Sequence, residues 1–375
     1  MSLNSHELDQ YYSEGYVIKE DVYSLQELEP IKAAIAELVD EKAAALNQEG
    51  ELATEDLFAD EPVETRLARI YEADQDAGPK IVRHIQGGGG GGYSGPAMFE
   101  MYTHPPLLSC IESIVGPDII GSSVYRIRPK LPNWERGEVP WHQDSGYLLA
   151  HCDRNLIVTC WVPLVDSSLH NGCLYVMPRA HRQGIFEHFT GGHGGYLEIP
   201  GKELPNKPIP MEMKAGGVLF MTNMTPHSSF ENKSDGVRWS VDLRYQDSRA
   251  PNNVDDPPDS VTREREPVTM ACYPPEADFV IRDTQQRDRE VRDPDTFHEL
   301  RKRYEEARLK FVAGDRALFR CRFGVPFKIV PGPIARPVIV SRLLSPTPAA
   351  MVVQKVVGHL IKICTRVADG TSLNA

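Results

Sequence analysis

The first third of the chain carries apolar residues at helical spacing. A capping-box sequence, from Ser24 to Glu27, stands at the start of this pattern, and such a box satisfies backbone N–H groups at a helix N-terminus. The apolar positions that follow are Leu28, Ile31, Ile35 and Leu38. The spacing predicts a helix over Leu25–Ala45, and we expect the helices of this third to pack on one face of a sheet.

From Ile119 to Tyr245 the pattern changes to short runs of β-branched and aromatic residues separated by turn-forming residues. Such runs predict the strands of a sandwich or barrel. The predicted strands are Ser123–Ile127, Leu156–Val162, Leu174–Met177, Val218–Thr222 and Val237–Tyr245. Between them lies the segment 183–216, which is rich in Gly, His and Pro, and we expect a long insertion that is either a lid or disordered.

The other segments have weaker patterns. Gly87–Gly92 predicts a flexible loop, at the mouth of a site or elsewhere on the surface. A helix is predicted over Pro294–Val312. The tail, 349–367, places its apolar residues on one helical face, which predicts docking on the core or on a second subunit, as in a homodimer formed through this extension. A membrane-surface helix is the alternative, and membrane contact is disfavoured because the cationic face is sparse. We expect a main domain over 1–315 and a C-terminal extension over 316–375.

Composition narrows the classes of function. The chain has 375 residues and a net charge of −12, which disfavours nucleic acid as a partner because phosphates repel an acidic surface. An anionic ligand must therefore be attracted by local charge. Seven cysteines without CxxC spacing indicate free thiols in a reducing compartment. The sequence shows no secretory signal and no apolar run of about 20 residues, so we expect a cytoplasmic protein.

The chemistry-bearing pattern is His142-Gln143-Asp144 followed by His227. Two imidazoles and one carboxylate form the facial triad that holds non-haem Fe(II) and leaves three adjacent coordination positions open. On a strand, residues 142 and 144 would point to the same face. His227 follows the apolar run 218–221, as expected for a residue at the end of a buried strand. A structural zinc site is the alternative for the same three residues.

Arg238 lies in a strand-like run, eleven positions after His227, where its planar guanidinium could bind a carboxylate. Together, His142-Gln143-Asp144, His227 and Arg238 resemble the pattern of the phytanoyl-CoA dioxygenase family of Fe(II)/2-oxoglutarate oxygenases. Further segments are similar to that family over 11–18, 161–166 and 171–181, and the resemblance covers about 8–247. It implies a mainly β fold with flanking α-helices, whose core, about 119–247, is a double-stranded β-helix of the jelly-roll, cupin-like kind.

The resemblance also implies roles for single residues. His142, Asp144 and His227 would bind Fe(II). Four further residues would contact the cosubstrate 2-oxoglutarate: Arg238 and Ser229 at its distal carboxylate, Trp161 as a wall of its pocket, and Lys130. Each role has an alternative. Arg238 could form an ordinary salt bridge with Asp242 or Glu231, and Ser229 could be a turn hydroxyl. Trp161 could serve core packing alone, and Lys130 could be a solvated lysine at a strand edge. The residues expected on the substrate side are Tyr147, Tyr196 and Arg136.

The function that follows from the resemblance is a dioxygenase that oxidises, by hydroxylation, a small-molecule metabolite. 2-Oxoglutarate and O2 would be converted to succinate and CO2. The intact carboxylate at Asp144 favours hydroxylation or desaturation over halogenation, which needs that position vacated. An acyl-CoA hydroxylase is one alternative, although no dense Lys/Arg cluster for the CoA phosphates flanks the motif. A non-catalytic cupin-like binding protein is the other.

Overall fold

The structure is a computed structural model, and it describes residues 1–52, 57–87, 92–122, 124–146, 156–190, 196–249 and 279–302. The helices of the first third are α1 (Ser5–Glu14), α2 (Leu25–Gln48), α3 (Val63–Ala73), α4 (Ala77–Ile85), α5 (Pro96–Thr103) and α6 (Pro105–Val115). The predicted helix is confirmed as α2, with the capping box formed between Ser24 and Glu27. It continues three residues beyond the predicted end.

The strands before the β-helix core are β1 (Tyr16–Lys19) and β2 (Ile119–Gly121). The core strands are β3 (Arg126–Lys130), β4 (Val139–His142), β5 (Val158–Pro163), β6 (Leu174–Val176), β9 (Ile209–Met211), β10 (Val218–Thr222), β11 (His227–Ser229) and β12 (Arg238–Asp247). A small hairpin pairs β7 (Phe189–Thr190) with β8 (Leu197–Glu198), and β13 (Phe279–Arg282) follows the core. Residues 294–302 are helical.

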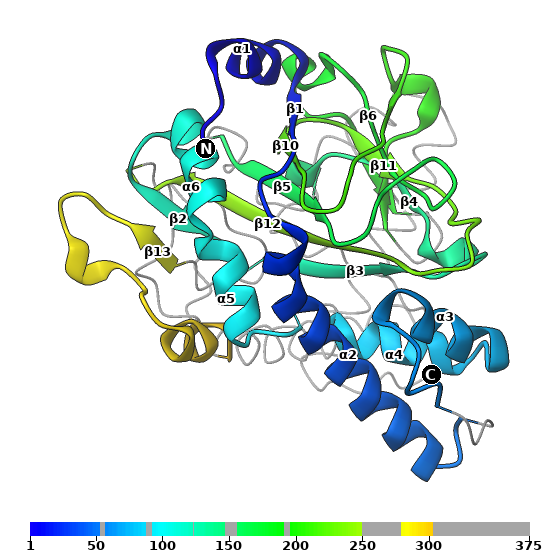
Figure 1. The fold of residues 1–375 in the computed structure, drawn as a ribbon. Helices are drawn as coiled ribbons and strands as arrows, with labels where there is room; N and C mark the ends of the chain where they lie inside the picture. Colours follow the sequence, from blue (N-terminus) through cyan, green and yellow to red (C-terminus); the bar gives the residue numbers. More distant parts are fainter. Residues whose placement is uncertain are drawn as a thin grey trace, which may run out of the picture. The chain divides into compact units, whose positions relative to one another are not determined.

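The core strands form two antiparallel sheets (Figure 1). The larger has the order β1-β10-β5-β12-β2-β13, with β3 also paired to β12, and the smaller has the order β4-β11-β6-β9. Along the chain β3, β5, β10 and β12 belong to the larger sheet, and β4, β6, β9 and β11 to the smaller. This winding between two facing sheets is the double-stranded β-helix, so the expected core is confirmed. With the helices of the first third, the fold is mixed α and β rather than mainly β.

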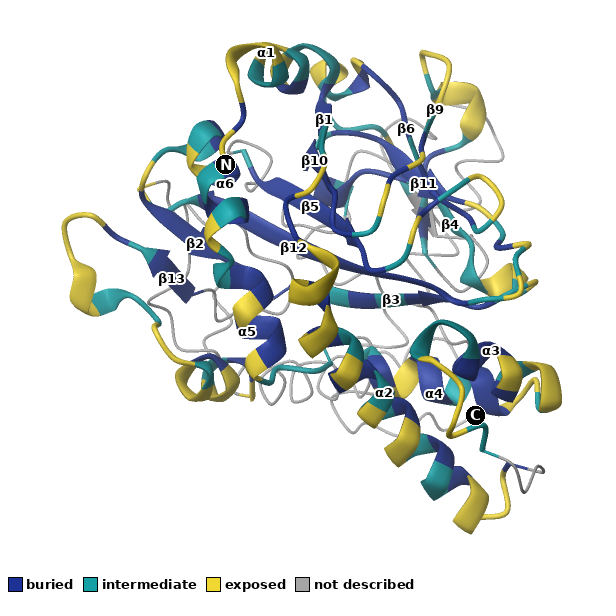
Figure 2. Ribbon diagram, in the orientation of Figure 1, coloured by how far each residue is buried: buried dark blue, intermediate teal, exposed yellow. Residues whose placement is uncertain are grey.

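Side-chain alternation on the larger sheet separates two apolar layers. On β5, Val158, Cys160 and Val162 pack in one cluster with residues of the N-terminal helices. Trp161, on the other face, packs between the sheets with Leu219 and other residues. The strands of the larger sheet are dark in the view by burial, and α2 shows both buried and exposed positions along its length (Figure 2). The helices therefore back one sheet, as expected, and leave the interior between the sheets to the site.

Two strand predictions need correction, and one further strand was not predicted. The first predicted core strand is displaced, because β3 begins at Arg126. The segment 183–216 is not only a loop, since β9 within it pairs with β6 as a core strand. Strand β1, which extends the larger sheet beside β10, was not predicted. Most of the glycine run, the end of the predicted helix over Pro294–Val312 and the whole of 316–375 lie outside the described residues. Within the described segments, no helix is long and apolar enough to cross a membrane.

Candidate active site

His142 and Asp144 lie at the junction of a strand and a turn. His142 is the last residue of β4, but Asp144 begins a 3-10 turn, Asp144–Gly146. The expectation that both residues lie on one strand is therefore wrong, because the Gly146 N–H donates to the Gln143 carbonyl at 2.9 Å and closes the turn. The buried Gln143 side chain fixes this turn by donating to the carbonyls of Gly184 and Met224.

His227 meets the turn from the neighbouring strand. Strand β11 pairs with β4 so that His227 lies opposite His142, and the two ring centroids are 4.2 Å apart. The ligand atoms of His142, Asp144 and His227 all lie within 4.8 Å of one another, and all three residues are buried. Antiparallel register thus brings together residues that are far apart in the sequence.

Backbone carbonyls set the orientation of both imidazoles. Nδ1 of His142 lies 2.8 Å from the Pro140 carbonyl, and Nδ1 of His227 lies 3.0 Å from the Thr225 carbonyl. A carbonyl only accepts, so Nδ1 carries the proton and Nε2 keeps the lone pair that a metal requires. Burial and the neighbouring His227 lower the pKa of His142 to about 3, so this ring is neutral at neutral pH.

Asp144 is held by a buried guanidinium. Arg244 donates to both carboxylate oxygens, at 3.1 Å and 3.0 Å, and the Thr159 hydroxyl donates to Oδ2 at 2.6 Å. Burial alone would raise the pKa of Asp144, but Arg244 and the two histidines outweigh it and hold that pKa well below its usual range. The carboxylate is therefore ionised, and an ionised carboxylate is the form that binds a divalent cation.

Further ion pairs extend from Arg244 to Asp242 and Arg128. The third nitrogen of Arg244, Nη1, donates to Oδ2 of Asp242 at 3.1 Å, and Arg128 donates through Nε to Oδ1 of Asp242 at 2.8 Å. Asp144, Arg244, Asp242 and Arg128 thus form a chain of alternating charge. Arg128 and its neighbour Arg244 keep the pKa of Asp242 low despite burial, which acts in the opposite direction.

A second cationic group lies at the other end of the cavity. Arg238 is buried, with one terminal nitrogen 2.5 Å from the Ser240 hydroxyl and the other 3.3 Å from that of Ser229. Its guanidinium lies over the ring of Trp161, 5.2 Å from the centroid. Its Nε is buried and has no hydrogen-bond partner among the described residues. Neither Asp242 nor Glu231 forms a salt bridge with it within the described segments.

Lys130 lies beside Arg238, directly opposite it in the pairing of β3 with β12. Its ammonium donates to the carbonyls of Gly137, Ser229 and Phe230 at 2.8, 3.1 and 2.7 Å. Burial, together with Arg238, holds the pKa of Lys130 well below its usual value. Lys130 is therefore a buried residue that joins the neighbouring loops, not a solvated edge lysine.

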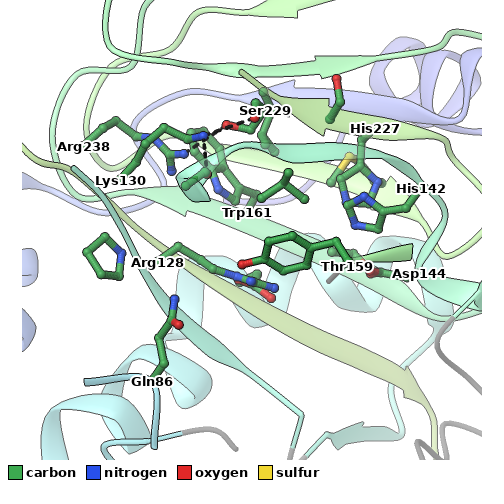
Figure 3. A pocket seen from close by; sticks show the side chains of 18 of the residues that line it. Gln86, Arg128, Lys130, His142, Asp144, Thr159, Trp161, His227, Ser229 and Arg238 are labelled. Carbon is green, nitrogen blue, oxygen red and sulfur yellow. Dashed lines mark hydrogen bonds and ion pairs between the residues drawn. The ribbon is translucent and has the colours of Figure 1, made fainter. Parts of the chain in front are cut away.

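One cavity contains both groups (Figure 3). Arg238, Lys130 and Ser229 lie at one end, and His142, His227 and Asp144 at the other, with Trp161 and Arg128 between them. The cavity measures about 770 Å³, counting the open space at its mouth. Its wall also includes Val82, Gln86, Pro129, Trp134, Val139, Leu174, Tyr196 and Met221.

Of the residues expected on the substrate side, one lines the cavity and one does not. Tyr196 lines the cavity, whereas Arg136 is exposed in a short 3-10 helix, Glu135–Gly137, and does not line it. Tyr147 lies outside the described residues. Sequence reasoning missed Arg128, Thr159, Ser240 and Arg244. The alternation of polar and apolar residues along 238–245 could have indicated two of them, because Arg238, Ser240, Asp242 and Arg244 share one face of β12.

The residues present fit a ferrous ion. Two imidazoles and one ionised carboxylate form the donor set of a facial triad. The Nε of the buried Arg238, which has no hydrogen-bond partner among the described residues, marks a place for an anion. A double-stranded β-helix with this triad and a buried guanidinium defines an Fe(II)/2-oxoglutarate-dependent dioxygenase.

Comparison with known proteins gives the family. The sequence profile described as "Phytanoyl-CoA dioxygenase (PhyH)" matches residues 11–240, and the chain belongs to this family. It is 26% identical over 279 residues to "Phytanoyl-CoA dioxygenase" of Arabidopsis thaliana, covering 67% of this chain and 96% of the relative. Identity to "Phytanoyl-CoA dioxygenase domain-containing protein 1" of Mus musculus is 22% over 273 residues, covering 66% and 91%. A solved structure titled "non-heme monooxygenase; ThoJ apo" aligns with a TM-score of 0.49 at 16% identity, covering 82% of this chain and 98% of that chain.

Proposed function

We propose that this dioxygenase hydroxylates a small-molecule metabolite, coupled to the conversion of 2-oxoglutarate and O2 to succinate and CO2. The observation that carries the proposal is the single cavity that joins the buried His142, Asp144 and His227 to the buried Arg238. Fe(II) held by these three residues supplies the O2 chemistry. The contribution of the protein is placement of the reactants and exclusion of water.

Arg238 would bind the distal carboxylate of 2-oxoglutarate. Its guanidinium is always charged and presents a planar fork, and Ser229 and Ser240 hold it from two sides. Trp161 would hold the carbon chain of the cosubstrate, since its ring lies beside the guanidinium. Lys130 would fix the end of this subsite through its three carbonyl contacts. Burial strengthens each of these charged interactions because water does not compete for them.

The site also favours hydroxylation over halogenation. Asp144 keeps its carboxylate in the triad, so that coordination position is filled by the protein and is not left for a halide.

An acyl-CoA hydroxylase is the second candidate, because relatives carry the words phytanoyl-CoA in their names. A CoA thioester would need exposed cations near the mouth to bind its phosphates. Among the described lining residues, the cations are Arg128, Lys130, Arg238 and Arg244. Lys130 and Arg244 are buried and bound to carbonyls or carboxylates, and Arg238 is buried among serine hydroxyls. Arg128 is partly exposed, but a single guanidinium is too few cations for the several phosphates of CoA. We therefore favour a substrate without CoA.

Succinate release tests the proposal. The protein is incubated with Fe(II), ascorbate, 2-oxoglutarate and O2, alone and with a metabolite panel, and succinate is measured. His227→Ala and Asp144→Ala should abolish release while circular dichroism stays unchanged for His227→Ala. Lys214→Ala is the matched control, because Lys214 pairs with Asp166 on the surface with 79% of its side chain exposed, and it should retain full release. Wild-type protein that releases no more succinate than His227→Ala would refute the function.

A further inference from the structure

Arg128 differs from the other cations of the cavity because part of it remains open. Its side chain is 31% exposed, whereas that of Arg244 is 9% exposed. It lies on β3 two residues before Lys130, on the same face, and opposite Ser240. Its only bond among the described residues is the one from Nε to Asp242, and the residue lines the cavity.

The ion pairs of Asp242 explain why the terminal nitrogens of Arg128 form no hydrogen bond to this carboxylate. Asp242 uses Oδ2 for Arg244 and Oδ1 for Nε of Arg128. Asp242 therefore divides its two oxygens between two guanidinium groups, and it meets Arg128 through one bond instead of a two-pronged pair. The two terminal nitrogens have no hydrogen-bond partner in the described part of the chain, so the fork that matches a carboxylate in two parallel bonds is available to a ligand.

The charge of the loaded cavity favours an anion at this position. The chain from Asp144 to Arg128 has two positive and two negative charges and cancels. The remaining charges are Arg238, Lys130 and a ferrous ion, four positive charges against the two negative charges of 2-oxoglutarate. If Lys130 is neutral, Arg238 and the ferrous ion still carry three positive charges against the two negative charges of 2-oxoglutarate. An uncompensated charge in a buried site is unfavourable, so an anionic substrate group is stabilised there.

Other residues of the cavity wall indicate the polarity of the rest of the ligand. Val82 of α4 and Gln86, the residue directly after this helix, reach the cavity together with Trp134. Gln86 points toward the part of the cavity beside Arg128 (Figure 3). The Gln86 side chain has no hydrogen-bond partner among the described residues. This wall offers apolar surface with one amide that can donate and accept.

We propose that Arg128 binds a carboxylate of the primary substrate, so that the substrate is a compact carboxylic acid with an apolar body and one further polar group near Gln86. This inference rests on the proposed function, and it names the substrate class of the same site. Arg128 would determine specificity by a two-pronged hydrogen bond that a neutral analogue cannot form. The other carboxylate that could lie here is that of 2-oxoglutarate near the metal, and the test separates the two.

The test measures binding to the full chain loaded anaerobically with Mn(II) and 2-oxoglutarate. The probes are aliphatic and aryl-alkyl carboxylic acids of increasing length, each paired with its primary amide. The wild type should bind the best acid at least tenfold tighter than its amide. Arg128→Lys keeps a charge for Asp242 but lacks the fork, so it should fold and lose at least tenfold of that preference. Gln86→Leu should weaken acid and amide equally.

Two results would overturn the proposal. One is a wild type that binds no acid more tightly than its amide. The other is an Arg128→Lys protein that keeps the preference but has a tenfold weaker Kd for 2-oxoglutarate, which would place Arg128 at the cosubstrate. Failure of the proposed function has a different signature, namely no binding of 2-oxoglutarate and no succinate release by the wild type itself.

Discussion

Replacing Arg244 by Met should destabilise the metal-free protein strongly. Arg244 donates twice to Asp144, once to Asp242 and once to the Val124 carbonyl, and its side chain is buried. Methionine fills much of the same volume but leaves the charge of Asp144 without a cation. Asp242 keeps Arg128, so one carboxylate loses its ionic partner. Breaking one buried pair costs about 3 to 5 kcal/mol, and we expect this loss in the free energy of unfolding at pH 7.

The loss in the free energy of unfolding should become smaller as the pH falls. In the wild type the pKa of Asp144 is lowered, so its contribution to stability is present above the unfolded pKa and disappears as the pH falls through the folded value. In Arg244→Met, burial without the guanidinium should raise this pKa above the unfolded one. The variant then gains stability as the pH is lowered from 7 toward about 5, and its deficit against the wild type narrows.

Urea unfolding of the metal-free proteins measures both effects, with and without saturating Mn(II). The metal supplies positive charge to Asp144, so it should narrow the deficit of the variant further. Arg249→Met is the control, since Arg249 pairs with Asp247 at the surface and is 60% exposed, and it should unfold like the wild type. A deficit for Arg244→Met below about 1 kcal/mol, or one that widens toward pH 5, would refute the buried-pair reasoning.

Three further changes test other parts of the site and fold. Arg238→Leu should raise the KM for 2-oxoglutarate by roughly a hundredfold, because a two-pronged charged hydrogen bond is lost; an unchanged KM would place the cosubstrate elsewhere. Thr159→Val removes the 2.6 Å bond to Asp144 and should weaken Mn(II) binding, measured by titration, by about tenfold to a hundredfold. Gly216→Ala should lower the free energy of unfolding by at least about 1 to 3 kcal/mol, since φ is +85° and the added Cβ would lie 2.1 Å from the Tyr23 carbonyl oxygen; equal stability would contradict this geometry.

Much of the fold was predictable because its elements have strong local signals. The capping box at Ser24 defined the start of α2, and the apolar run over 218–222 gave β10 residue for residue. Strand β9 was missed because Ile209–Met211 is three residues long, contains a proline and owes its place to pairing with β6. Pairing across a sheet depends on distant residues, and so it leaves little local pattern.

The triad was predictable, but the means of its assembly was not. The spacing of His142 and Asp144 indicated a metal site, although the geometry is that of a strand end and a 3-10 turn. The partners of Asp144 could not be assigned because Arg244 lies 100 positions away. The sequence suggests Asp242 only as a partner of Arg238, whereas it binds Arg128 and Arg244.

Strand β12 links the stability of the fold to the geometry of the site. Arg238 and Arg244 lie on one face of it, separated by roughly 20 Å at the usual rise of a strand. Its other face, Trp239, Val241, Leu243 and Tyr245, is buried in the apolar layer shared with the helices. The Trp239 indole also donates to the Val63 carbonyl at 2.8 Å, at the start of α3. A slip of one residue would exchange the two faces of β12. The packing of the helices on one face therefore fixes the register of the strand. It also fixes the separation between the guanidinium of Arg238 at the cosubstrate end and that of Arg244, which holds the metal-binding carboxylate.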